Sequence, residues 1–287
     1  MIGYILAILT GFASASYYAL IKKTIKNASI FSMAVYPYLF TLPFLFVSLF
    51  LIGIPIVPAK YFLFIIPWLI VNIFATLLYL KAFKLADLTL AMPMLAFTPL
   101  FLLFMSPLIV GEFTSLFGLV GVLFVVLGSY VLHASKTRNL LVPFKAMIKN
   151  KGSYYMLIVA FLYAIGASFD RMLVVMTSPV FHSTMGIFSL SLSMLVIGLL
   201  FDREAILKPN VAFNKLLLIG LALFSTVMLG NFANKFIIAP YVISLKRLSI
   251  LFSMIYGYYW FKEKDLKKRI IAASLMVVGT IIISIYG

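Results

Sequence analysis

Four charged side chains interrupt long apolar stretches of this sequence, as the adjacent pairs Asp170-Arg171 and Lys246-Arg247. A charge near the centre of a membrane-spanning helix costs about 2.5–3.5 kcal/mol on insertion scales, so it persists there only with a partner or a use. Both pairs lie about five or six residues from helix ends that we expect on one membrane side, a depth of about 8–10 Å. Their positions therefore allow Asp170 to pair with Lys246 or Arg247.

Three cations against one anion leave two positive charges unneutralised in this set. A dry helix bundle would not hold such an excess, so we expect it to face a water-filled cavity and to bind an anionic group. Carboxylates and phosphates both suit a guanidinium, which binds them through paired hydrogen bonds. The competing interpretation is that these residues form salt bridges that lock the bundle, or extend to the membrane interface.

Aromatic and amide side chains within the apolar stretches are further candidates for a cavity wall. Buried amides need hydrogen-bond partners, and polar cavities are commonly lined by such groups. Hydrogen bonding between helices is the alternative role. The candidates are Tyr17, Tyr18, Asn72, Tyr79, Asn231 and Asn234.

The sequence offers little for metal or enzyme chemistry. Its two histidines, His133 and His182, lie near expected helix ends, and a metal site would need more ligands. There is no cysteine, and no nucleotide-binding loop, Ser-His-Asp set or paired-carboxylate motif. We therefore expect no metal, no cofactor and no enzyme activity.

Composition indicates what surrounds these residues. Of 287 residues, 64% are hydrophobic and only 10% are charged, whereas a soluble domain keeps about 25% charged. The surface must therefore contact membrane lipid, and the net charge of +16 indicates loop lysines beside lipid headgroups rather than a nucleic-acid partner. A spanning helix needs about 20 apolar residues. The expected spans are 2–21, 30–53, 61–80, 88–110, 113–133, 153–175, 181–201, 214–237, 240–261 and 267–286.

The distribution of Lys and Arg supports ten spans. Loops with odd numbers hold 18 of the 23 basic residues, whereas even-numbered loops hold only Lys60 and Lys235. Because basic loops remain in the cytoplasm, this bias predicts a multi-pass protein of the cell membrane with both termini outside.

The chain also carries an internal repeat. A shift of 151 residues places Glu112 on Glu263 and Gly128 on Gly279. In both places an acidic residue separates two apolar runs. Each half holds five spans, an odd number, so the halves cross the membrane in opposite senses. Inverted repeats of this kind are typical of transporters that bind substrate between the halves.

The predicted fold is thus all-α, with ten membrane helices arranged as two inverted five-helix repeats around a central cavity. The first repeat covers 1–136, a basic loop covers 137–152, and the second repeat covers 153–287.

Local features within the spans are expected to be structural. Glu112 should cap the fifth span, where the helix dipole favours a carboxylate. Pro93 and Pro99 should bend the fourth span, and Gly118 and Gly121 should permit close helix packing.

Two stretches, 79–87 and 239–252, each followed by a Gly-Glu or Lys-Glu pair, resemble the drug/metabolite transporter superfamily in its ten-helix EamA-type form. The resemblance implies alternating access and substrates from amino acids to phosphorylated sugars. Many such relatives are drawn with cytoplasmic termini, the reverse of our prediction. The Lys246-Arg247 pair also resembles the phosphate-binding pair of plastid-type phosphate translocators. Span 88–110 lacks the charged residue that those proteins add there.

We therefore expect a secondary transporter, an exporter or exchanger, for a small polar metabolite that is amino-acid-like or otherwise anionic. The alternatives are a flippase for a lipid-linked or phosphorylated substrate and a membrane-embedded lipid enzyme. The expected partners are the small-molecule substrate and membrane lipid, with a monomer or a dimer as the assembly.

Overall fold

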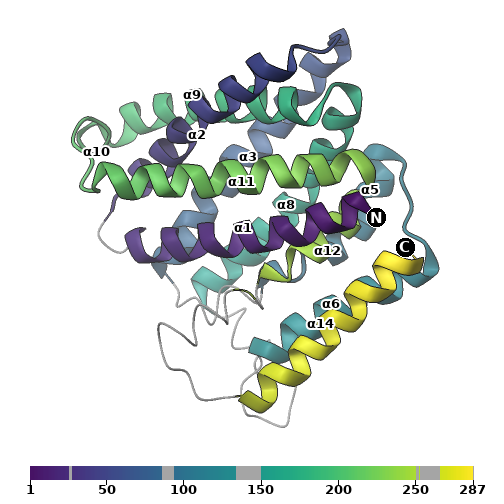
Figure 1. The fold of residues 1–287 in the computed structure, drawn as a ribbon. Helices are drawn as coiled ribbons and strands as arrows, with labels where there is room; N and C mark the ends of the chain where they lie inside the picture. The colour runs from purple at the N-terminus through teal and green to yellow at the C-terminus, as the bar shows by residue number, and fades with distance from the viewer. Residues whose placement is uncertain (26–27, 86–93, 134–149, 250–251, 253–265, 287) are drawn as a thin grey trace.

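The computed structural model describes residues 1–25, 28–85, 94–133, 150–249, 252 and 266–286 (Figure 1). Every regular element among them is helical, and six helices are long and apolar enough to cross a membrane. The helices are α1 (Ile2–Ile25), α2 (Ile30–Ile52), α3 (Ala59–Leu85), α5 (Thr98–Val110), α6 (Leu116–His133), α8 (Lys151–Met176), α9 (Pro179–Phe201), α10 (Arg203–Leu207), α11 (Phe213–Phe236), α12 (Ala239–Lys246) and α14 (Leu266–Tyr286). The chain is an all-α membrane protein.

The six long helices are α1, α2, α3, α8, α9 and α11, and each covers one predicted span. The shorter apolar helices α5, α6 and α14 fall within the predicted fourth, fifth and tenth spans. The short α10 was not expected. Asp202 begins it by accepting a hydrogen bond from the backbone N–H of Ala205.

The predicted fourth and ninth spans are not continuous helices where the structure describes them. A turn at 96–97 precedes α5, whose first turn contains Pro99, and a second turn at 247–248 follows α12. Proline suits a helix start because its missing N–H would have no partner there. The two turns coincide under the 151-residue shift. Pro93 and the remainder of both spans lie outside the described residues.

The most extensive helix pairings join the N-terminal half of the chain to the C-terminal half. Helix α1 packs on α11, α3 on α8, α2 on α9 and α6 on α14. The α6–α14 pair lies at one edge of the molecule, whereas the other helices form the main bundle (Figure 1).

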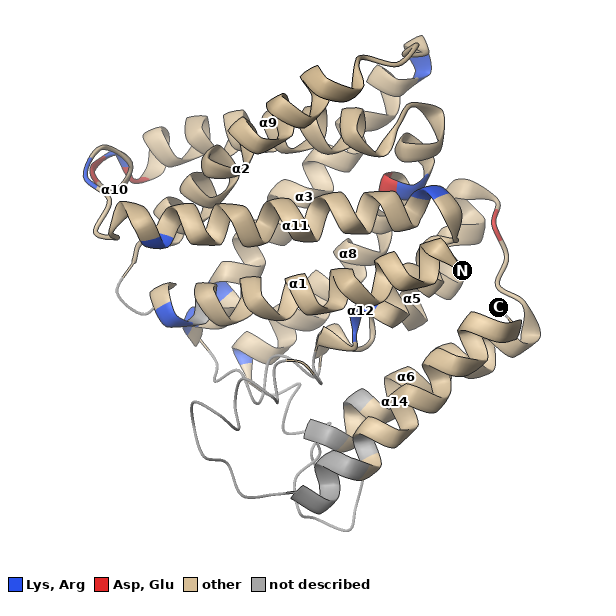
Figure 2. Ribbon diagram, in the orientation of Figure 1, with Lys and Arg blue, Asp and Glu red and all other residues tan. Residues whose placement is uncertain are grey.

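Charged residues lie mainly toward the helix ends, and long uncharged stretches of helix lie between them (Figure 2). This distribution places the apolar lengths of the helices against lipid and one another. Both termini lie at the same end of the bundle (Figure 1).

Glycines set the closeness of α6 to α14. A Cβ added to Gly279 would lie 2.6 Å from the carbonyl oxygen of Gly121, and one added to Gly121 would lie 2.8 Å from that of Gly279. On the same helix face, a Cβ at Gly118 would overlap the hydroxyl of Tyr241. Gly118 and Gly121 therefore permit close packing, as the sequence predicted.

A Gly279→Val substitution is expected to push α14 away from α6 and to destabilise the folded protein by about 2 kcal/mol, the usual scale of overpacking. Thermal unfolding in detergent, followed by size-exclusion chromatography, measures the effect as a lower melting temperature. The exposed neighbour Val278 provides the control. A Val278→Leu variant should melt like the parent, and an equal loss in both variants would contradict the packing argument.

Candidate functional site: a polar cavity between the two halves

A cavity of about 200 Å³ lies among the helices of the main bundle. Its wall draws on α1, α2, α3 and α5 from the first half and on α8, α9, α11 and α12 from the second. The structure brings together eight of the nine candidate residues that we propose from the sequence as a substrate site. They are Tyr17, Asn72, Tyr79, Asp170, Asn231, Asn234, Lys246 and Arg247, and Tyr18 joins them on the wall.

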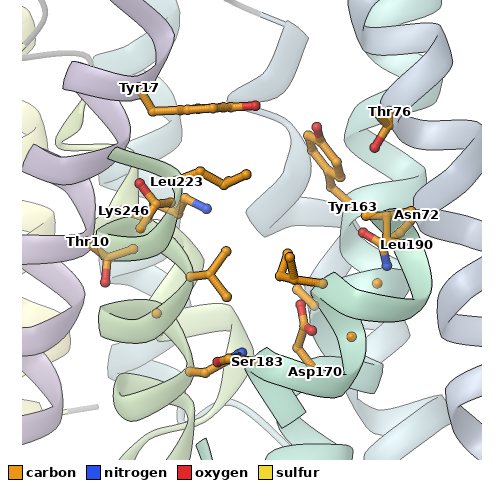
Figure 3. A pocket seen from close by; sticks show the side chains of 18 of the residues that line it. Thr10, Tyr17, Asn72, Thr76, Tyr163, Asp170, Ser183, Leu190, Leu223 and Lys246 are labelled. Carbon is orange, nitrogen blue, oxygen red and sulfur yellow. Dashed lines mark hydrogen bonds between the residues drawn. The ribbon is translucent and has the colours of Figure 1, made fainter. Parts of the chain in front are cut away.

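Lys246 and Arg247 form the cationic part of the wall at the end of α12. The Lys246 side chain points into the cavity (Figure 3) and makes no hydrogen bond or ion pair within the described residues. Arg247 is only 5% exposed, and its Nη2 donates a hydrogen bond of 2.7 Å to the hydroxyl of Thr98. Its Nε is buried without a partner. The carbonyl end of α12 favours both cations, since a helix C-terminus carries partial negative charge.

Asp170 lies across the cavity from Lys246 (Figure 3), and its partners differ from those predicted. Its Oδ1 accepts a hydrogen bond of 2.7 Å from Nε1 of Trp68 and lies 2.9 Å from Nε2 of His182. No ion pair joins Asp170 to Lys246 or Arg247 in the described part of the chain. The short connection after α8 folds α9 back beside it, which brings His182, in the first turn of α9, to Asp170.

Arg171 is not part of the cavity wall, contrary to the sequence prediction. Its Nε and Nη2 donate hydrogen bonds of 2.8–3.1 Å to the Glu112 carboxylate, and Nη1 donates to the backbone oxygen of Asn234. Adjacent helical residues point in different directions, so Arg171 leaves the cavity that Asp170 enters. Glu112 lies four residues before α6 begins and pairs with Arg171 rather than capping that helix.

Two of the three candidate asparagines donate hydrogen bonds within the protein, and the third has a buried oxygen without a partner. Nδ2 of Asn72 donates to the backbone oxygen of Trp68 at 2.9 Å, and Nδ2 of Asn231 donates to the hydroxyl of Ser183 at 2.9 Å. Oδ1 of Asn234 is buried and has no partner. The Asn231 bond joins α11 to α9, as the interhelical alternative anticipated, whereas the free oxygen of Asn234 leaves capacity for a ligand.

Tyrosines gather in the same cavity. Tyr17 and Tyr18 have ring centroids 5.8 Å apart, and Tyr79 lies 6.2 Å from Tyr18 and 6.3 Å from Tyr163. The hydroxyl of Tyr79 is buried without a hydrogen-bond partner. Buried hydroxyls are normally satisfied, so this one is available to a bound molecule.

Sequence reasoning missed His182, Trp68 and Tyr61. Tyr61 is buried, and its hydroxyl lies 3.2 Å from Nδ1 of His182. Two signals pointed to this cluster. A tight connection at 177–178 places residues on either side of it next to one another, and Trp68 is one helical turn from Asn72 on the same face.

Comparison with known proteins supports this architecture. A solved crystal structure, described only as "Crystal structure of protein", superposes with a TM-score of 0.75 over 98% of this chain and 95% of its own. The two sequences are 13% identical, so the likeness shows the fold alone. No curated protein matches the sequence.

A family model provides the assignment. The EamA-like transporter family matches residues 1–133 and 150–285, which are the two halves of the chain. That family consists of multi-pass membrane transporters rather than enzymes. With nearly all of its length matched, the chain belongs to the EamA-like transporter family of the drug/metabolite transporter superfamily.

Proposed function

We propose that this secondary transporter exports or exchanges a small polar metabolite that is amino-acid-like or otherwise anionic, and that Lys246 and Arg247 bind its anionic group. One observation carries the proposal: two cations share a cavity and have no acidic partner among the described residues. Asp170, which also lines the cavity, and Glu112 are already held by His182 and Arg171.

The unused hydrogen-bonding groups support an anionic ligand. Lys246 and the Nε of Arg247 are donors, and the hydroxyl of Tyr79 is a third. Carboxylates and phosphates accept several such bonds at once, and a charged donor in a site shielded from water binds them strongly. A cavity of about 200 Å³ limits the ligand to a small metabolite.

The packing pattern supports two inverted repeats of five spans. In the order of the predicted spans, the first span packs on the eighth and the third on the sixth. The second span packs on the seventh, and the fifth on the tenth. Exchanging the halves leaves this set of pairs unchanged, as a two-fold axis between inverted repeats requires. Rocking of one half on the other then exposes the cavity to each side in turn. The excess of Lys and Arg in odd-numbered loops supports a topology with both termini outside the cell.

The chain is proposed to work as a monomer in lipid, because helices from its two halves already enclose the cavity. Neither the cavity nor the proposed binding groups need a second copy.

The test is counterflow in proteoliposomes, in which internal unlabelled solute drives uptake of the same labelled solute. The probes are L-glutamate, L-phenylalanine, glucose 6-phosphate and a fluorescent phospholipid. We expect uptake of at least one soluble anionic probe, which Lys246→Met reduces about tenfold or more, the scale of one lost charged hydrogen bond.

A matched variant controls for the loss of a lysine. Lys235 lies in the last turn of α11 and is exposed, so Lys235→Met should leave counterflow unchanged. Transport that survives Lys246→Met at the parental rate would overturn the assignment of Lys246. Movement of the phospholipid alone would identify a flippase instead.

A further inference from the structure

We propose that Asp170 and His182 together bind one proton, which crosses the membrane with the anionic substrate. The pair forms a continuous chain of hydrogen bonds on the cavity wall, from Trp68 through Asp170 and His182 to Tyr61. Nothing in the binding of an anion at Lys246 and Arg247 uses this chain. Its coupling to transport rests on the proposed function, whereas its capacity to bind a proton does not.

The hydrogen bonds suit both states of the imidazole. In the neutral state, Nε2–H donates to Asp170 at 2.9 Å, and Nδ1 accepts from the hydroxyl of Tyr61 at 3.2 Å. In the protonated state, Nδ1–H donates to the Tyr61 oxygen, and the carboxylate neutralises the imidazolium. The added proton therefore finds an acceptor without any change in the positions of the heavy atoms.

Exposure supplies the route for the proton. His182 is only 1% exposed, whereas the side chain of Asp170 is 29% exposed and lines the cavity. Oδ2 of Asp170 makes no hydrogen bond within the described residues. Water in the cavity thus reaches the carboxylate, whose Oδ2 receives the proton first. Nε2 already holds a proton, so the ring takes up the second one at Nδ1 when the bond from Tyr61 opens.

The cluster crosses the boundary between the two halves. Trp68 and Tyr61 belong to α3, and Asp170 and His182 belong to α8 and α9. The bonds from Trp68 and Tyr61 must therefore break or change when the halves move. Protonation changes the strength of those bonds, so it shifts the balance between conformations, as coupling between a proton and a conformational change requires.

The surrounding charges set the direction of coupling. The titratable or charged side chains that face or adjoin the cluster are Tyr61 on α3, the Arg171–Glu112 pair beside α8, Lys246 and Arg247 on α12, and Tyr17, Tyr18, Tyr38, Tyr79 and Tyr163 around the cavity. A bound proton adds positive charge to a cavity that already contains two unpaired cations. It therefore favours entry of an anion, and the anion in turn favours the proton. A monoanion and one proton move together without net charge.

Tryptophan fluorescence tests proton binding without any substrate. The chain has two tryptophans, Trp68 and Trp260, so the Trp260→Phe variant reports on Trp68 alone. The rings of Trp68 and His182 are 5.3 Å apart, and an imidazolium quenches indole emission more strongly than a neutral imidazole. We expect the emission of Trp68 in detergent to fall as pH is lowered.

Substitutions identify the residue that causes this change in fluorescence with pH. In the Trp260→Phe background, His182→Gln should abolish it, and Asp170→Asn should alter it because the imidazolium loses its counter-charge. The chain has one other histidine, His133, and His133→Gln should leave the transition in place. A transition that persists in the His182→Gln variant, or its absence from the Trp260→Phe protein, would overturn the proton site.

Proteoliposomes loaded with a pH-sensitive dye test the coupling. Inward gradients of L-glutamate or glucose 6-phosphate should acidify the interior, and Asp170→Asn should lower the ratio of protons to anions that enter. Anion entry without acidification would overturn coupling and leave the proposed function intact. A fluorescence transition in a protein that moves none of the probes would uphold the proton site and count against the proposed substrate class.

Discussion

Replacing Arg247 with methionine is expected to weaken substrate binding about a hundredfold, the largest effect of any single substitution in the cavity. Arg247 is 95% buried, lacks an acidic partner in the described chain and keeps its Nε free. Two charged hydrogen bonds to a bound anion are together worth about 3 kcal/mol, which corresponds to that factor. Concentration-dependent counterflow in proteoliposomes measures it as a rise in the half-saturating concentration.

Two further variants separate binding from a structural role of Arg247. Arg247→Lys keeps the charge and loses the planar fork, so its effect should lie between those of the parent and Arg247→Met. Thr98→Val removes the one hydrogen bond that the Arg247 side chain makes within the described residues. If Arg247 served mainly to hold α12 against α5, Thr98→Val would impair counterflow as severely as Arg247→Met. We expect a clearly smaller loss.

The fold followed from the sequence wherever one physical quantity dominated. Apolar length defines a membrane helix, so α2 and α9 begin and end within a few residues of the predicted spans. The breaks beside Phe97 and Arg247 were not predicted as breaks, because hydropathy remains high through a turn inside a bundle. Pro99 marked only one of them. The shared 151-residue offset was the remaining sequence signal, since it relates the two breaks to each other.

The sequence predicted which residues line the cavity better than it predicted which of them bond to each other. Depth along a helix placed Asp170 and Lys246 at similar levels, and both line the cavity. Depth does not give the rotation of a helix, which decides whether a side chain faces a cavity or a neighbour. Rotation is what separates Asp170 from Arg171. It also explains why His182, expected only near a helix end, became the partner of Asp170.

The pairing of Arg171 with Glu112 leads to the second large effect, on the association of the two halves. Glu112 belongs to the first half and Arg171 to the second, and their side chains are 25% and 13% exposed. Removing one partner leaves the other poorly solvated and unpaired. We expect Arg171→Gln and Glu112→Gln each to lower the free energy of unfolding by about 2 kcal/mol. Thermal unfolding in detergent measures both.

The double variant shows whether the cost arises from the pair itself. Two amides of similar shape can hydrogen-bond to each other and leave no unpaired charge, so Arg171→Gln with Glu112→Gln should cost less than the sum of the single changes. Strict additivity would mean that the residues act independently, for example through the bond of Arg171 to Asn234.

Loss of this bond between the halves should also change how often the cavity opens. The chain contains no cysteine, so a single Ser183→Cys substitution provides one thiol on the cavity wall. A membrane-impermeant thiol reagent should label it faster in the Arg171→Gln background, because a contact that holds the halves together at this end has been removed. Equal labelling rates in the two backgrounds would show that the pair stabilises the fold without controlling access.

A higher rate in the Arg171→Gln background would show that the charged residues among the membrane helices have two separate roles. Lys246 and Arg247 would face the substrate, while Arg171 and Glu112 would control its access.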